Sequence, residues 1–149
     1  MKKSPEIIKA ESNMEAGVIS AEGFLGDDKR DLASVLEEDA LLLSVNSLEI
    51  KDIAQKLEYL MEEGRKGLGE PVTVDGKWLV RTDEARGVIA CPWEDGVFKK
   101  INVTVERTDI KKSISYTDLS IHMLKEHGFL EGRGAPFRLE PSVLAEVLY

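Results

Sequence analysis

Hydrophobic side chains along this chain of 149 residues recur first at helical spacing, then at alternating positions, and then at helical spacing again. Across residues 27–66 the interval is three or four positions, as in α-helices with one buried face. Across residues 71–116 apolar and polar positions alternate, which is typical of half-buried antiparallel strands. Residues 117–149 return to the helical interval. This order predicts a single α+β domain, in which two N-terminal and two C-terminal helices pack on an antiparallel meander of about five strands.

The clearest start signal for a helix lies at Asn46. Asparagine suits the N-cap position, and Glu49 follows three residues later, as in a capping box. Val45 and Ile50 occupy the two positions of a hydrophobic staple around that cap. The pattern therefore predicts a helix that begins just after Asn46 and ends at a glycine near residue 64 or 67.

The segment before this helix is less sharply defined. Residues 16–26 resemble a short strand, and Asp27 or Asp28 then suits the N-cap of a first helix. The apolar run at residues 40–45 is too short for its periodicity to distinguish a continuation of that helix from a buried strand. The polar residues 1–12 are expected to be irregular.

Turn chemistry divides the central region into strands. Asp75 and Gly76 are the residue pair favoured by a type I′ turn, so they predict a hairpin between two short strands. A third strand is expected at residues 87–91, after a polar turn. The alternation at residues 97–107 predicts a fourth strand, and residues 111–116 are expected to pair back onto it as a fifth.

The two C-terminal helices are bounded by residues that favour helix ends. Thr117 or Asp118 suits the first N-cap, and Gly128 suits a left-handed C-terminal stop. Pro141 fits the first position of the second helix, where its missing N–H costs nothing.

Composition and charge narrow the class of protein. The chain has 42% hydrophobic and 32% charged residues, enough for a core, and no apolar run approaches a membrane span of about 20 residues. Its net charge of −8 makes nucleic acid and anionic membranes unsuitable partners. A single cysteine and a start without an apolar stretch indicate a cytoplasmic protein. One glutamine and three asparagines beside many charged residues favour a thermophilic source.

His122 and His127 are the candidate catalytic residues, because histidine is the side chain that transfers protons near neutral pH. They are five positions apart, about 140° around a helix, and so do not form the i, i+4 pair of a helical zinc site. On the helical wheel His127 lies on the apolar arc and His122 toward the surface.

Neither a reactive cysteine nor a metal site is predicted. Cys91 is followed by acidic residues, which disfavour its thiolate, so a buried structural role is the simpler interpretation. Asp27, Asp28 and Asp31 lack the spacing of a calcium-binding loop. We therefore expect no metal and no cofactor.

The segment EGRGAPFR offers a candidate ligand-binding loop. Arg133 and Arg138 could hold a phosphate or carboxylate, and the closely spaced Gly132 and Gly134 would let the backbone approach it. The following helix, which begins at Pro141, would direct further N–H groups at the anion. The alternative is a simple joint between two helices, in which the arginines pair with nearby acids.

Three functions remain open from the sequence. The first is a non-enzymatic binding or interaction module, since no nucleophile and base are visible together. The second is a small enzyme that acts on an anionic metabolite held at the EGRGAPFR loop. The third is a structural subunit of a larger assembly, or a homo-oligomer, because Leu41 to Leu43 and Tyr149 provide more apolar surface than one small sheet requires.

Overall fold

The computed structural model describes residues 4–149 as an α+β fold. Within this range the chain forms five helices and one four-stranded antiparallel sheet. The helices are α1 (Pro5–Asn13), α2 (Leu32–Val45), α3 (Ile50–Arg65), α4 (Asp118–His127) and α5 (Pro141–Leu148). The strands are β1 (Val72–Val74), β2 (Trp78–Ala90), β3 (Val97–Arg107) and β4 (Lys112–Thr117). Among the helices of residues 4–149, none combines the length and apolarity needed to cross a bilayer.

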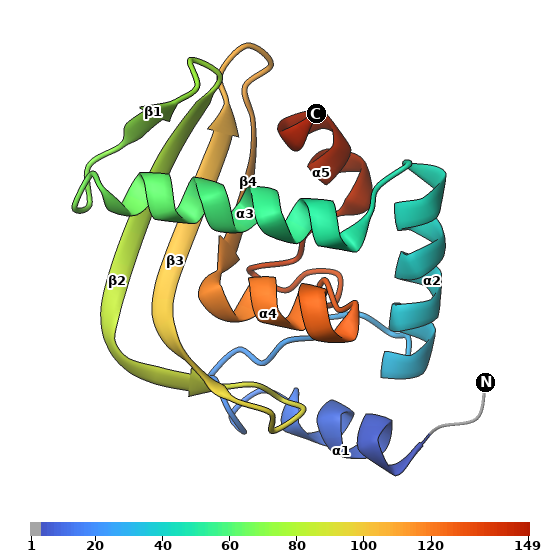
Figure 1. Cartoon of the computed structure of the whole chain (residues 1–149). Helices are drawn as coiled ribbons and strands as arrows, with labels where there is room; N and C mark the ends of the chain where they lie inside the picture. Colours follow the sequence, from blue (N-terminus) through green and yellow to red (C-terminus); the bar gives the residue numbers. More distant parts are fainter. Residues whose placement is uncertain (1–3) are drawn as a thin grey trace.

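The sheet has the strand order β1-β2-β3-β4, as expected for a meander in which each strand pairs with the next. Figure 1 shows α3 lying across the strands, with α4 beside it and α5 next to β4. Helix α2 stands at the far side of these helices from the sheet, and α1 lies near the bent ends of β2 and β3. The helices that cover the sheet thus come from both ends of the chain.

Strand β2 is longer than the sequence pattern predicted. It runs continuously through the region where we expected a turn and a separate strand at residues 87–91. Its pairing with β3 shifts register between Ala85 and Val88, and Gly87 within this bulge has φ +90°. A bulge absorbs extra residues and bends the strand without ending it. The five expected strands are therefore four.

Several local predictions in the sheet and after it are confirmed. Asp75 and Gly76 both have positive φ, 55° and 64°, as the hairpin turn requires. Ile101 and Val103 are buried, whereas Asn102 between them is exposed. The helix ends agree as well, with a left-handed glycine after α4 and a proline at the start of α5.

The boundary between α2 and α3 differs from the prediction. Asn46 ends α2 instead of starting α3, and its side-chain amide donates to the Leu42 carbonyl at 2.8 Å. Residues 40–45 are therefore helical. Ser47 takes a left-handed φ of 57°, and α3 begins after Glu49, which makes no side-chain cap. The apparent capping box was misleading because Asn can close a helix as well as open one.

The N-terminal region also corrects the sequence analysis. Helix α1 was not expected, yet Ser4 caps it and Pro5 occupies its first turn. Residues 16–26 form turns and bends instead of a strand, and α2 is capped by Asp31, later than predicted. Ala10 of α1 is buried against the rest of the chain. A short helix is stabilised mainly by such packing, which local patterns do not report.

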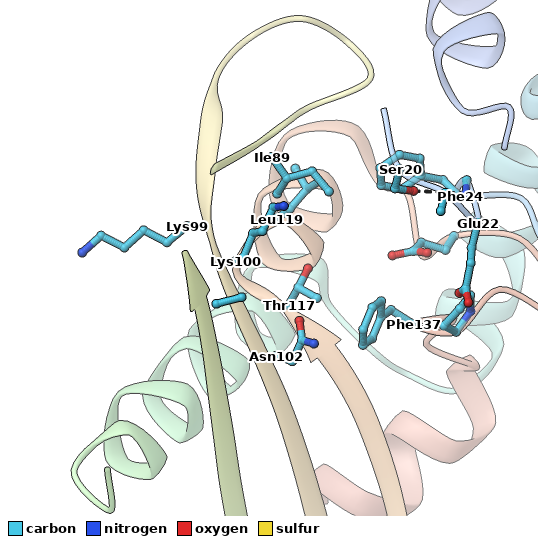
Figure 2. A pocket seen from close by; sticks show the side chains of 15 residues that line it. Ser20, Glu22, Phe24, Ile89, Lys99, Lys100, Asn102, Thr117, Leu119 and Phe137 are labelled. Atoms are coloured by element: carbon cyan, nitrogen blue, oxygen red, sulfur yellow. Dashed lines mark hydrogen bonds between the residues drawn. The ribbon is translucent and has the colours of Figure 1, made fainter. Parts of the chain in front are cut away.

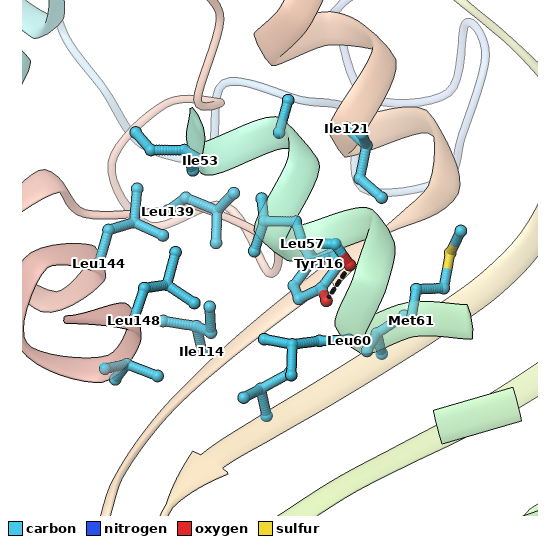
Figure 3. Close-up of a cluster of buried hydrophobic side chains, with 14 of the residues drawn as sticks. Ile53, Leu57, Leu60, Met61, Ile114, Tyr116, Ile121, Leu139, Leu144 and Leu148 are labelled. Carbon is cyan, nitrogen blue, oxygen red and sulfur yellow. Dashed lines mark hydrogen bonds between the residues drawn. The ribbon is translucent and has the colours of Figure 1, made fainter. Parts of the chain in front are cut away.

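Two groups of buried side chains hold these elements together. The larger group joins α3, α4 and α5 to the sheet, and Tyr116 at its centre donates its hydroxyl to the Leu57 carbonyl at 2.7 Å (Figure 3). Leu43 belongs to this group, so the exposed apolar surface around Leu41 is smaller than the sequence suggested. The second group joins α1 and α2 to α4 and to the end of β2; its members are Ala10, Met14, Phe24, Leu32, Val35, Cys91, Leu119, Met123 and Phe129.

A candidate metal centre between the β2–β3 loop and α4

The short loop that connects β2 to β3 is a tightly bonded turn. Cys91 begins it and is fully buried. The Cys91 amide donates to the Gly96 carbonyl at 3.0 Å, and the Glu94 amide donates to the Cys91 carbonyl at 2.8 Å. Asn13, at the end of α1, donates its side-chain amide to the Pro92 carbonyl at 2.8 Å. These bonds fix the Cys91 side chain and the following carboxylate in place.

Helix α4 faces this loop and carries both histidines. Its start is well defined, because Thr117 and Ser120 form a reciprocal capping box. Its end is equally well defined, since Gly128 adopts a left-handed φ of 65°. His122 lies in the middle of the helix and His127 is its last residue. A short helix fixed at both ends positions the two imidazoles.

The Asp95 carboxylate lies between the two histidines. His122 Nε2 is 3.0 Å from Asp95 Oδ1, and His127 Nε2 is 2.7 Å from Asp95 Oδ2. The Cys91 sulfur completes the group, and one ligand atom from each of the four side chains lies within 4.8 Å of all the others. The side chains of the histidines are only 16% and 17% exposed, and that of Asp95 is 38% exposed. The cluster thus lies at the surface, with Cys91 buried, the histidines partly buried and Asp95 exposed to water.

Aromatic rings hold the imidazoles in these orientations. Trp93 stacks on His127 with ring centroids 4.1 Å apart and an interplanar angle of 5°. Phe98, on β3, contacts His122 with a centroid distance of 4.4 Å. The imidazole rings of His122 and His127 therefore direct Nε2 toward Asp95, and the aromatic rings beside them restrict their rotation.

The charges within the cluster favour a carboxylate beside a neutral thiol. Partial burial of Asp95 favours its protonated form, but hydrogen bonds from Cys91, His122 and His127 outweigh it and hold the Asp95 pKa well below its usual range. Burial, together with the hydrogen bond to Asp95, raises the pKa of the Cys91 thiol to about 12. A thiol of this kind is a poor nucleophile, which argues against covalent catalysis at Cys91.

The four side chains nevertheless form a suitable ligand set for a transition metal. Imidazole nitrogen, thiolate sulfur and carboxylate oxygen are the three ligand types that zinc accepts. A tetrahedral site with bonds of about 2.0–2.3 Å has ligands about 3.3–3.8 Å apart, so the observed cluster needs only small side-chain movements to enclose an ion. A bound ion would replace the hydrogen bonds between Asp95 and the histidines.

Sequence reasoning identified the two histidines but not the site that they form. Because of their separation around the helix, the two histidines cannot bind a metal ion as an i, i+4 pair on one helical face. A third side chain from another segment can still contact both of them. The missed signal is the spacing Cys91-x3-Asp95 followed by His122-x4-His127, which resembles the paired spacing of many zinc sites. His122 also lies closer to the interior than the helical wheel suggested.

Arg138, one of the two arginines of the EGRGAPFR loop, is bonded within the protein. Its guanidinium donates to both carboxylate oxygens of the fully buried Asp39, at 2.5 and 3.0 Å, and to the Glu131 carbonyl at 2.8 Å. It also contacts Glu140 at 3.2 Å. Arg138 therefore has few donors left for a ligand.

The remaining loop residues pack against an earlier part of the chain. The Arg133 amide donates to the Asp28 carboxylate at 3.1 Å, while the residue itself is exposed. A Cβ atom at Gly132 or Gly134 would collide with residues 25–27, so the glycines permit close approach of two backbones. Anion binding at this loop stays a prediction, and the two histidines lie in a different cluster.

Comparisons of the chain with protein-family models, with curated proteins and with solved structures give no match. The chemistry of the described side chains is therefore the basis on which a function can be assigned.

Proposed function

We propose that this chain is a metal-binding protein whose ligands are Cys91, Asp95, His122 and His127. The observation that supports this function is the convergence of a thiol, a carboxylate and two imidazoles, with ligand atoms within 4.8 Å of one another. They come from two segments about thirty residues apart in sequence, each of which is held in place by its own hydrogen bonds.

The mixed ligand set favours zinc over the other common ions. Calcium and magnesium prefer sites made of oxygen atoms, and only Asp95 supplies one here. Four protein ligands of sulfur, nitrogen and oxygen match the tetrahedral preference of Zn²⁺. Cobalt(II) shares this geometry and provides a spectroscopic substitute for zinc.

The proposed role of the ion is structural. Four protein ligands fill a tetrahedron and leave no open position for a substrate, in contrast to catalytic zinc sites, which keep one. The ion would join the β2–β3 loop to α4 and so reinforce the contacts that Trp93 and Asp95 of the loop already make with the two histidines. This role agrees with a non-enzymatic binding protein and gives no support to an enzyme that acts on anionic metabolites.

The direct test is a titration of metal-free protein with Co²⁺ and Zn²⁺. We expect one Co²⁺ per chain, with visible absorption of a tetrahedral site and near-ultraviolet charge transfer from the Cys91 thiolate, both lost when Zn²⁺ is added. Zinc at 100 times its dissociation constant should raise the melting temperature by roughly 5–11 °C, which corresponds to about 2.7 kcal/mol.

Matched variants distinguish this site from incidental binding. Cys91→Ser should abolish the charge-transfer band, and Asp95→Asn should weaken zinc binding at least tenfold. Glu94→Gln is the control, because Glu94 is adjacent in sequence but pairs with Lys9 and Asn13 outside the cluster. If zinc neither binds at one equivalent nor stabilises the fold, or if Glu94→Gln has the same effect as Asp95→Asn, the proposal is wrong.

A further inference from the structure

A second feature, separate from the metal centre, is a cavity of about 340 Å³ near the bend of the sheet. It lies between β2 and β3, the start of α4, and the two irregular segments at residues 20–24 and 136–137 (Figure 2). Its walls are mainly apolar, and Figure 2 shows Phe24 and Phe137 on the side opposite Ile89 and Leu119. The cavity shares no residue with the Cys91 cluster, so its function is independent of the metal proposal.

The unusual residue in this cavity is Glu131, which lines it and is only 3% exposed. Its backbone has a left-handed φ of 67°, and such a conformation is costly for a residue other than glycine. The surrounding bonds maintain it: Arg138 donates to the Glu131 carbonyl at 2.8 Å, and the next amide, of Gly132, donates to the Phe24 carbonyl at 2.9 Å. A leucine would fill this position without burying a carboxyl group, so packing alone does not account for a glutamate here.

Burial favours the protonated, uncharged form of this carboxyl. Burial raises the pKa of Glu131 to about 8, and the hydrogen bond from Ser120 opposes this only in part. The side chain consequently carries an O–H donor in the wall of the cavity. A protonated carboxyl is polar but carries no charge, so it does not require a cation beside it.

Two further polar side chains line the same cavity as the glutamate. Asn102 on β3 and Thr117 at the end of β4 are directly paired across the sheet, and both line the cavity. Figure 2 shows both side chains pointing toward it. An amide and a hydroxyl together supply donors and acceptors without a fixed charge.

Glu22, Lys99 and Lys100 also line the cavity, and all three are exposed, so water can solvate their charges. Lys100 lies on the same face of β3 as Asn102, because successive side chains of a strand alternate. Figure 2 shows the Lys99 side chain pointing away from the cavity. The cavity thus combines mainly apolar walls with the hydrogen-bonding groups of Glu131, Asn102 and Thr117, and apolar walls with a few polar groups are the common character of small-molecule sites.

We propose that this cavity binds a small uncharged molecule that consists of an apolar body about the size of one ring and an amide or carbonyl group. The apolar body would lie between the two phenylalanines and the aliphatic wall. The amide or carbonyl group of the ligand would accept a hydrogen bond from Glu131 and form further hydrogen bonds with Asn102 and Thr117. A carboxylate ligand would have to give up its hydration among mainly apolar walls, and an amine would gain an ion pair only if Glu131 released its proton.

The test uses three probes with the same ring and different charge: benzamide, benzoate and benzylamine. Binding to the protein is followed at pH 7 by chemical-shift changes in NMR spectra. We expect benzamide to bind with changes concentrated at Phe24, Asn102 and Phe137, and the two charged probes to bind at least tenfold more weakly. In wild-type protein the affinity for benzamide should fall about tenfold between pH 7 and pH 9, as Glu131 loses its proton.

Variants separate this site from weak surface binding. Asn102→Leu should weaken benzamide binding at least fivefold, whereas Thr104→Leu, at another exposed position of β3 outside the cavity, should leave it unchanged. Glu131→Gln retains a donor, so it should bind benzamide but lose the pH dependence. Preference for benzylamine or benzoate, no binding of benzamide at millimolar concentration, or equal effects of the two leucine variants would overturn the proposal.

Discussion

Replacement of Glu131 by glutamine tests how the buried carboxyl affects stability. Glutamine has nearly the same shape and stays neutral, whereas glutamate must remain protonated in the folded protein up to a pKa of about 8. In the unfolded chain the same carboxyl ionises near pH 4.5. Between these values the folded state binds more protons than the unfolded state, so stability falls as pH rises.

The size of the effect follows from the two pKa values. The reference is low pH, where the carboxyl is protonated in both the folded and the unfolded chain. Compared with that reference, the difference in proton binding at Glu131 lowers the free energy of unfolding at pH 5 by less than about 1 kcal/mol. At pH 8 the decrease reaches about 4 kcal/mol. Wild-type protein should therefore lose about 3–4 kcal/mol between pH 5 and pH 8 that the glutamine variant does not lose, or about 10 °C in melting temperature for a chain of this length.

The assay is urea unfolding of both proteins at pH 5, 6, 7 and 8. Other titrating groups are common to both proteins, so the difference between their profiles isolates Glu131. We expect the two proteins to be closest in stability at pH 5 and the variant to become the more stable one as pH rises. Parallel profiles would mean that Glu131 ionises in the folded protein as it does in water, and the account of its buried environment would be refuted.

Two further substitutions test the packing of the fold. Arg138→Ala should lower the free energy of unfolding by about 3–5 kcal/mol, because it leaves the fully buried Asp39 carboxylate without its bidentate partner. Urea unfolding of the Arg138→Met/Asp39→Leu double variant tests this cause, and recovery of stability would confirm it. Gly64→Ala places a Cβ atom 2.5 Å from Val80 Cγ1, so it should separate α3 from the sheet and cost about 1–3 kcal/mol; an unchanged urea midpoint would contradict this close approach.

The parts of the fold that the sequence determined are those decided by neighbouring residues. The Asp75-Gly76 turn follows from the backbone angles that these two residues tolerate, and the left-handed end of α4 follows from Gly128. The alternating burial of β3 follows from the period of a strand with one covered face. Each feature is settled within a few residues, so local patterns were sufficient to predict it.

The remaining elements depended on contacts between distant segments. Helix α1 is short and is stabilised by packing, as the burial of Ala10 shows, so its own sequence gave only a weak signal. The bulge in β2 merged two expected strands, because pairing with β3 continues past Gly87. Asn46 was assigned to the wrong helix because the same side chain can bond either helix end.

The candidate sites were decided almost entirely by tertiary structure. His122 and His127 stood out in the sequence, but only the folded chain brings Asp95 between them and Cys91 beside it. Arg138 was a candidate either for ligand binding or for pairing with a nearby acid; it contacts Glu140, but its bidentate partner Asp39 lies 99 residues away in sequence. Glu131, which lies between Leu130 and Gly132, gave no sign of burial. Local sequence sets backbone angles and the period of burial, but the charge, exposure and partners of a side chain depend on which segments pack around it.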